Sequence, residues 1–257
     1  PPLQHIIHDS RNIQSLTNNI IWNIFADQEH NIWLGTDYGI SLSRYNSALQ
    51  FIPISQITGT GDGNQFYSLF RDSKGFYWFG GANGLIRFTD PAGERHDAIW
   101  YRMGDKTYPL SHNRIRHIYE DKEQQLWIAT DGSINRYDYA TRQFIHYNIV
   151  DNTGTYNTNW TYYIFEDTAG QLWISTCLGG IFVVDKHKLM QSTSGQYIAE
   201  QNYSVHNGLS GMFINQIIPD NEGNVWVLLY NNKGIDKINP RTREVTKLFA
   251  DELTGEK

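Results

Sequence analysis

Five aspartates, each followed six residues later by a tryptophan, are the most regularly placed carboxylates in this sequence of 257 residues. The pairs are Asp27 and Trp33, Asp72 and Trp78, Asp121 and Trp127, Asp167 and Trp173, and Asp220 and Trp226. A ring of carboxylates could bind a metal ion or supply the acid and base of a hydrolytic site. A short carboxylate at the start of a tight turn, however, also accepts backbone N–H groups. Because the pair recurs once per repeat, we interpret these residues as structural, and we expect no catalytic residue and no metal ligand among them.

No other group of side chains indicates metal, redox or nucleic-acid chemistry. The single Cys177 cannot form an internal disulfide, and the nine histidines lack zinc-site spacing. The formal net charge is −6, without a block of Lys or Arg that would bind nucleic acid. No apolar run approaches the roughly 18 residues of a membrane span. We expect no cofactor, no nucleic acid and no membrane contact, and we interpret the start at Pro1-Pro2 as that of a piece of a longer protein.

The residues around each pair predict the same series of strands and turns. In the first copy, 20–26 and 32–36 alternate like strands on either side of a turn, and 40–45 and 51–54 predict two more. Four antiparallel strands in about 45 residues are typical of a propeller blade. The tryptophans follow one another at intervals of 45 to 53 residues, which is the range of such repeats. The sequence therefore predicts an all-β fold, a β-propeller with five four-stranded antiparallel blades.

The predicted blades cover nearly the whole chain, and their limits are 19–62, 63–112, 113–158, 159–212 and 213–257, the last with a polar tail. Residues 1–18 are predicted to hold the outer strand of a preceding blade, Leu3 to His8, and a linker. The polar insertion 186–200 is predicted to be an exposed loop. Two interpretations stay open. The chain is part of a larger, seven-bladed propeller, or its five blades close into a ring with a displaced N-terminal strand.

The turn between the first two strands of each blade predicts one special backbone conformation. Gly75, Gly170 and Gly223 occupy its fourth position, where a left-handed conformation is needed. His30 and Gln124 occupy the same position in the other two copies, so we expect more strain there. The tryptophan that follows is predicted to fill the gap between neighbouring blades.

The repeat as a whole follows the pattern Ile/Leu-x-x-Asp-x-x-Gly-x-Ile/Leu/Val-Trp-Ile/Leu-x-Thr. It continues into Gly-Ile/Leu and a strand that ends in Arg-Tyr or Arg-Phe. It resembles the two-component regulator propeller repeat, most closely in 25–45 and 70–88, and the copy 119–137 adds Arg136-Tyr137. His206-Asn207-Gly208-Leu209-Ser210 is similar to the Asp-Gly-Leu link that often precedes a repeat in that family.

This resemblance implies the periplasmic sensor region of a hybrid two-component protein of Bacteroides-type bacteria. Such a parent carries two seven-bladed propellers, a β-sandwich domain, a membrane helix, a histidine kinase core, a receiver and a DNA-binding domain. Its ligand would be an oligosaccharide from polysaccharide breakdown. Kinase and receiver motifs do not occur in these residues, so we expect this chain itself not to be an enzyme.

Propellers usually bind ligands with the loops at the face where the first strand of each blade starts and the second ends. A sugar needs flat aromatic faces for its C–H groups and planar polar groups for its hydroxyls. The candidate ligand-binding residues at this face are Trp22, Asp37, Tyr38, Asn83, Arg114, Asp131, Trp160, Tyr230, Asn231 and Asn232. Arg114 could pair bidentately with an acidic sugar.

Three functions therefore compete. The first is sensing of an oligosaccharide without catalysis. The second is a scaffold for protein interaction or for a homodimer. The third is a glycan-cleaving enzyme, which would need two carboxylates roughly 5 to 10 Å apart, and Asp37 and Asp131 are the candidates for that pair.

Overall fold

The computed structural model describes residues 5–12, 14–45, 49–52, 65–89, 98–107, 109–230 and 234–248, and for 49–52 it describes the backbone alone. The chain forms two compact units, Pro1–Ile118 and Tyr119–Lys257. The boundary lies within a strand of the third sheet, and each unit is described by itself below. No helix among the described residues is long and apolar enough to cross a membrane.

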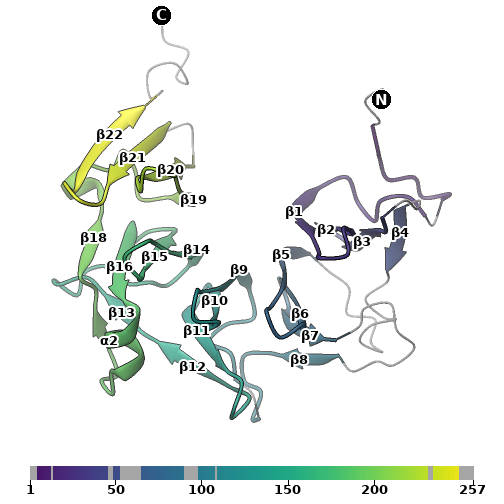
Figure 1. The fold of residues 1–257 in the computed structure, drawn as a ribbon, viewed down its shortest axis with the longest axis horizontal. Helices are drawn as coiled ribbons and strands as arrows, with labels where there is room; N and C mark the ends of the chain where they lie inside the picture. The colour runs from purple at the N-terminus through teal and green to yellow at the C-terminus, as the bar shows by residue number, and fades with distance from the viewer. Residues whose placement is uncertain are drawn as a thin grey trace, which may run out of the picture. The chain divides into compact units, whose positions relative to one another are not determined.

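Five four-stranded sheets make up most of the described chain, and in each the strands are paired in sequence order (Figure 1). The first contains β1 (Ile21–Ala26), β2 (Ile32–Thr36), β3 (Gly39–Ser43) and β4 (Leu49–Ile52). The second contains β5 (Phe66–Arg71), β6 (Tyr77–Gly81), β7 (Gly84–Phe88) and β8 (Ile99–Tyr101). The third contains β9 (Ile115–Glu120), β10 (Leu126–Thr130), β11 (Ser133–Asp138) and β12 (Gln143–Tyr147). The fourth contains β14 (Thr161–Glu166), β15 (Gln171–Thr176), β16 (Ile181–Asp185) and β18 (Gln201–Tyr203). The fifth contains β19 (Ile214–Pro219), β20 (Val225–Leu229), β21 (Ile235–Asn239) and β22 (Glu244–Leu248). The predicted all-β fold of four-stranded blades is confirmed.

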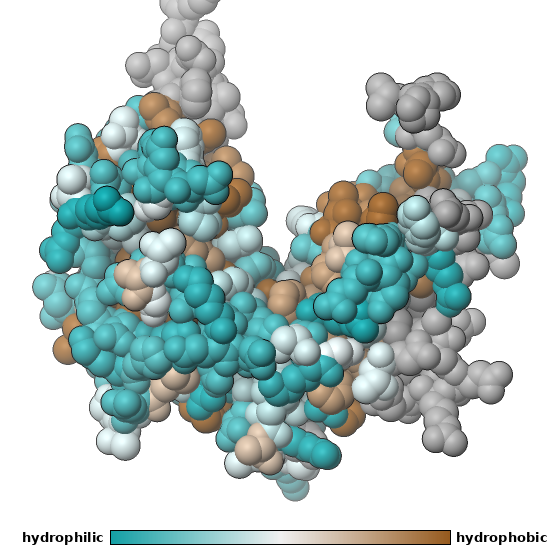
Figure 2. Space-filling model, in the orientation of Figure 1, coloured by the Kyte–Doolittle hydropathy of each residue, from teal (hydrophilic) through white to brown (hydrophobic). Residues whose placement is uncertain are grey.

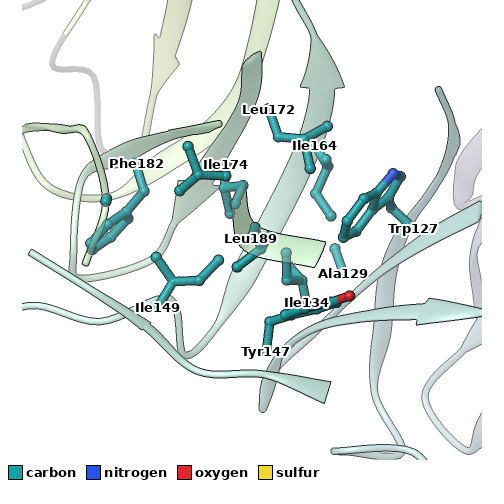
Figure 3. Close-up of a cluster of buried hydrophobic side chains, with 12 residues drawn as sticks. Trp127, Ala129, Ile134, Tyr147, Ile149, Ile164, Leu172, Ile174, Phe182 and Leu189 are labelled. Carbon is teal, nitrogen blue, oxygen red and sulfur yellow. The ribbon is translucent and has the colours of Figure 1, made fainter. Parts of the chain in front are cut away.

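The insertion after the third strand of the fourth blade is not an exposed loop, and that prediction is wrong. It begins with helix α2 (Lys186–Gln191), in which Lys186 and Leu189 are buried. Asp185 caps the helix, since its carboxylate accepts the N–H groups of His187 and Lys188. Figure 3 shows Leu189 pointing into the apolar cluster of the third and fourth blades.

The remainder of this insertion also has regular structure. Strand β17 (Tyr197–Ile198) pairs in parallel with β13 (Ile149–Val150), which lies in the link between the third and fourth blades. Beyond the insertion, a short 3-10 helix, η1 (Val205–Asn207), follows β18. The insertion is therefore tied to the link that precedes its own blade.

The strand predicted for Leu3 to His8 is also wrong for its described part. Residues 5–8 form no strand and are exposed, and residues 3 and 4 lie outside the described residues, as does the polar tail. His8 instead bonds to the residues that precede β1. Its Nδ1 lies 2.6 Å from the carbonyl oxygen of Leu16, and its N–H donates to Asn19 Oδ1 at 2.6 Å.

Each repeat aspartate holds together its own turn and its own tryptophan. In all five blades Oδ1 accepts the N–H groups two and four residues ahead, at 2.8 to 3.0 Å. Oδ2 accepts the indole N–H six residues ahead, at 2.7 to 3.0 Å. The spacing of six thus follows from one carboxylate serving both the turn and the next strand. The predicted structural role of the aspartates is supported, and the indole bond is a contact that the sequence reasoning missed.

The fourth turn position is left-handed in every blade, as predicted. Its φ angle is 87° at Gly75, 81° at Gly170 and 86° at Gly223. His30 and Gln124 adopt the same conformation, with φ of 64° and 61°. Both residues carry a Cβ and adopt a left-handed backbone conformation that L residues disfavour. The backbone strain therefore lies at the two positions where the sequence predicted it.

Replacing Gly223 with alanine should destabilise the second unit by about 1 kcal/mol, because alanine pays the cost of the left-handed conformation. A Cβ built at Gly223 meets nothing within 4 Å, so no clash contributes. Gln124→Ala in the same unit is the matched control and should change stability by less than about 0.5 kcal/mol. Urea unfolding of both variants measures this, and equal effects would contradict the backbone explanation.

The first blade shows how neighbouring blades pack. The ring of Trp33 lies 5.4 Å from that of Tyr77 and 5.6 Å from that of Phe79, both on the second blade. A Cβ at Gly35 would lie 2.7 Å from the carbonyl oxygen of Phe66, so glycine allows the two blades to approach closely. The predicted role of the tryptophan as a filler between blades is confirmed here, and Trp127 and Trp173 occupy equivalent apolar clusters.

The exposure of one side chain can be compared across all five blades at the fourth position of the first strand. Leu69, Ile118, Ile164 and Ile217 are 4 %, 2 %, 0 % and 0 % exposed, whereas Ile24 of the first blade is 68 % exposed. Ile32 on β2 is also 45 % exposed, and Figure 2 shows hydrophobic side chains gathered at the surface over β1 and β2. This face of the first blade therefore has the composition of a buried blade interface.

Candidate ligand-binding surfaces

In the first unit, the start of β1, the end of β2 and the start of β5 bring four side chains together. Trp22 Nε1 donates to Asp37 Oδ1 at 3.1 Å, and Gln65 Nε2 donates to the same oxygen at 2.8 Å. The Tyr67 hydroxyl donates to Gln65 Oε1 at 2.6 Å, and its ring stands edge-on to Trp22 with centroids 5.3 Å apart. We call these four residues the first-unit cluster. Trp22 is half exposed, so its indole face is open to a ligand.

A pocket of about 430 Å³ adjoins this cluster. Asp37 and Tyr38 line it from the β2–β3 turn, and residues between His8 and Asn18 line its other side. Tyr38 is 68 % exposed. Two of the predicted candidate residues therefore border a pocket.

Asn83 and Arg114, the other candidates in the first unit, have contacts of their own. The carbonyl oxygen of Asn83 accepts Arg102 Nε at 3.1 Å, and the Arg102 guanidinium lies over the Trp100 ring at 4.5 Å. The N–H of Arg114 donates to His112 Nδ1 at 3.0 Å.

In the second unit the candidates lie at the ends of the third, fourth and fifth blades. The N–H of Trp160 donates to the carbonyl oxygen of Asp131 at 3.0 Å, and its own carbonyl accepts the N–H of Cys177 at 2.9 Å. Trp160 has a φ of 55° and is 47 % exposed. The Tyr230 ring stands edge-on to Tyr162 at 6.1 Å. A bulky residue held left-handed with an exposed indole is the kind of strained position that is common at functional sites. Asn231 and Asn232 lie outside the described residues.

Two pockets of the second unit meet at two residues, Thr155 and Tyr156, that the sequence did not indicate as candidates. One, of about 320 Å³, is lined by Trp160, Leu178 and the segment 155–159. The other, of about 470 Å³, lies between the loop 151–156 and residues 199–207. Thr155 and Tyr156 line both pockets. The signal in the sequence is weak: an aromatic residue within a polar run between two blades.

Electrostatics fix the conformation of the loop 151–156. The Asp151 carboxylate accepts the N–H of Tyr156 at 2.8 Å and the hydroxyl of Thr153. Burial by itself raises the pKa of Asp151, but these hydrogen bonds outweigh it and lower the pKa below its usual value. Asp151 is therefore a charged structural residue of the loop. Among the described residues, no group of three His, Cys, Asp or Glu side chains could hold a metal ion.

The repeats match a known family over three stretches. Residues 15–38, 60–83 and 109–132 match the two-component regulator propeller model, and each stretch ends at the turn after the second strand of a blade. The chain carries two-component regulator propeller repeats. No curated protein matches the sequence significantly.

Solved structures are similar to the chain over its whole length. The extracellular domain of BT4673 from B. thetaiotaomicron, described as a hybrid two-component system, is 99 % identical over the full length of this chain, with a TM-score of 0.79. This chain covers 34 % of that chain, so it spans about a third of the length of that extracellular domain. That coverage agrees with the interpretation of the chain as part of a longer protein.

Two more distant structures share the fold. The extracellular domain of BT3049 from the same organism is 20 % identical, with a TM-score of 0.72, and the match covers 95 % of this chain and 30 % of that chain. Virginiamycin B lyase from Staphylococcus aureus is 16 % identical, with a TM-score of 0.63, and the match covers 89 % and 69 %. These two likenesses establish the propeller fold alone.

Proposed function

We propose that this chain is part of the ligand-sensing region of a hybrid two-component signalling protein, and that it binds a polysaccharide-derived oligosaccharide without cleaving it. Near-identity to an extracellular domain of a hybrid two-component system supports the sensing role. The observation that carries the ligand class is the gathering of exposed aromatic rings with amide and carboxylate groups at the loop ends, as in the first-unit cluster.

The arrangement of Asp37 favours binding over hydrolysis. Its Oδ1 accepts two hydrogen bonds, from Trp22 and Gln65, which fix the carboxylate among neutral donors. A glycosidase would place a second carboxylate roughly 5 to 10 Å from the first, whereas the groups that contact Asp37 Oδ1 are an indole and an amide. Any phosphotransfer would belong to kinase domains of the parent.

The exposed apolar face of the first blade favours a further interaction role. Ile24 and Ile32 occupy positions that are buried between blades elsewhere in the chain. We assign this face to another blade of the parent protein, because the BT4673 chain is about three times longer. A β-sandwich domain of the parent, or a second copy of this chain, would be the alternative partner.

Calorimetry of this chain against neutral, acidic and sulfated oligosaccharides tests the proposal, with chromatography of the sugar after each titration. We expect heat from at least one class and an intact sugar. Cleaved products that appear with the native chain and not with the heat-denatured chain would make the protein an enzyme. No heat from any class would refute oligosaccharide sensing by these blades.

A further inference from the structure

The two pockets that share Tyr156 form one surface of the second unit, which we call the Tyr156 groove. Its walls are the loop 151–157 and the segment 199–207, and its far end is formed by Trp160, Leu178 and Gly179. The parallel pairing of β13 with β17 brings these walls together, since β13 leads into the loop and β17 leads into the opposite wall. The groove therefore results from the insertion in the fourth blade.

Hydrogen bonds hold both walls in place without a ligand. In the loop, the N–H of Asp151 donates to the carbonyl oxygen of Tyr156 at 3.0 Å. In the opposite wall, Asn207 Nδ2 donates to the carbonyl oxygen of Asn202 at 2.6 Å, and Asn202 Nδ2 donates to that of Gly179 at 2.9 Å. A site that is already ordered loses little conformational entropy when it binds.

One bond joins the walls across the groove. The Tyr156 hydroxyl and His206 Nε2 lie 3.2 Å apart, with the two ring centroids at 6.3 Å. Tyr156 is half-buried and His206 is exposed. The Tyr156 ring thus stands between the two pockets, where a chain of several sugar units could lie against it.

The charge of the lining decides between ligand classes. Its carboxylates are Asp151 and Glu200, and no Lys or Arg occurs among the described residues that line the two pockets. Lys188 Nζ approaches Glu200 to 3.6 Å from outside the lining and balances it in part. An anionic sugar would meet carboxylates without a cation to pair with, whereas neutral hydroxyls would meet amide and hydroxyl groups such as Asn152 and Thr155.

We propose that the Tyr156 groove is a binding site for a neutral oligosaccharide, with Tyr156 and Trp160 as the two aromatic platforms. This proposal rests on the proposed function and narrows it to one surface and one chemical class. Aromatic faces suit the C–H surfaces of sugar rings, and the surrounding amides suit their hydroxyls. Because no charge pairing contributes, the affinity should not depend on salt.

Calorimetry of the whole chain tests the site, with neutral galacto-, manno- and xylo-oligosaccharides and with oligogalacturonate of equal length as probes. We expect binding of a neutral probe, with an affinity that changes less than twofold between 50 and 500 mM NaCl. Trp160→Ala should weaken that binding at least tenfold, and His206→Ala should weaken it as well. Tyr45→Ala, which removes an exposed aromatic ring of the first unit that is not a candidate binding residue, is the matched control and should leave it unchanged.

Each other outcome has a distinct meaning. Binding of a neutral probe that survives Trp160→Ala and His206→Ala would overturn the groove and leave the proposed function standing. Binding of oligogalacturonate alone would overturn the neutral class, and with it the groove. No binding of any oligosaccharide by the native chain would overturn both proposals. Circular dichroism of each variant verifies that a loss of binding is not a loss of folding.

Discussion

Replacing Lys186 with methionine should lower the stability of the second unit by about 3–5 kcal/mol, because it leaves two buried carboxylates without a cation. The Lys186 side chain is 1 % exposed, and its Nζ lies 2.9 Å from Glu166 Oε1 and 3.2 Å from Asp121 Oδ2. The two carboxylates are 3 % and 0 % exposed. Glu123 Oε2 lies 3.7 Å from Lys186 Nζ but is half exposed, so this third ion pair contributes little to the stability.

The two carboxylates cannot readily move away from the vacated position. Asp121 also accepts the indole N–H of Trp127 at 2.9 Å, and Glu166 Oε2 accepts the N–H of Lys122 at 2.9 Å. Burial lowers the pKa of Lys186, but Glu166 and Asp121 raise it by more, so the net shift is upward. The stabilisation that comes from the raised pKa of Lys186 is therefore fully present below pH 10.5 and is lost as the pH rises further.

Urea unfolding at pH 7, followed by circular dichroism, measures this loss. Lys188→Met is the control, because Lys188 lies two residues away in the same helix and is 65 % exposed. It should change stability by less than about 0.5 kcal/mol. A Lys186→Met variant within about 1 kcal/mol of the native chain would show that the buried ion pair does not hold α2 against the third and fourth blades.

Ile164→Ala should destabilise the second unit by about 2–5 kcal/mol, whereas Ile24→Ala should change stability by less than about 0.5 kcal/mol. The two isoleucines occupy the same position of the innermost strand in different blades. Ile164 is fully buried, and Figure 3 shows it beside Leu172 and Trp127, so truncation leaves a cavity. Ile24 is 68 % exposed, so truncation there creates none.

The same pair of variants tests the proposed cover of the first blade. In the longer extracellular domain we expect Ile24→Ala to become costly, by about 2 kcal/mol or more, because another blade would bury this residue. Thermal unfolding of the short chain and of the longer domain, each with and without the substitution, provides the comparison. An effect near zero in both would mean that this face stays open to solvent or to a different partner.

The sequence by itself determined where the blades lie, because the contacts that define each strand and turn join residues close together in the sequence. The contacts of each repeat aspartate lie within six residues, so spacing alone carries the turn and the following tryptophan. Period-two alternation predicted the strands for the same reason. The sequence also predicted that the starts of first strands and the ends of second strands meet, as Trp22 and Asp37 do.

Only the tertiary structure decided the role of the insertion after β16. Its Ser, Lys and Gln content predicted an exposed loop, but the partners of Lys186 are Asp121 and Glu166, which lie on other elements. Composition cannot reveal that a lysine is neutralised by carboxylates distant in sequence. The Tyr156 groove was not predicted for the same reason. One wall precedes the fourth blade in the sequence and the other lies around its last strand, and the pairing of β13 with β17 brings them together. Contacts within a few residues can be predicted from the spacing of residues in the sequence, whereas contacts between distant segments form only when the chain folds.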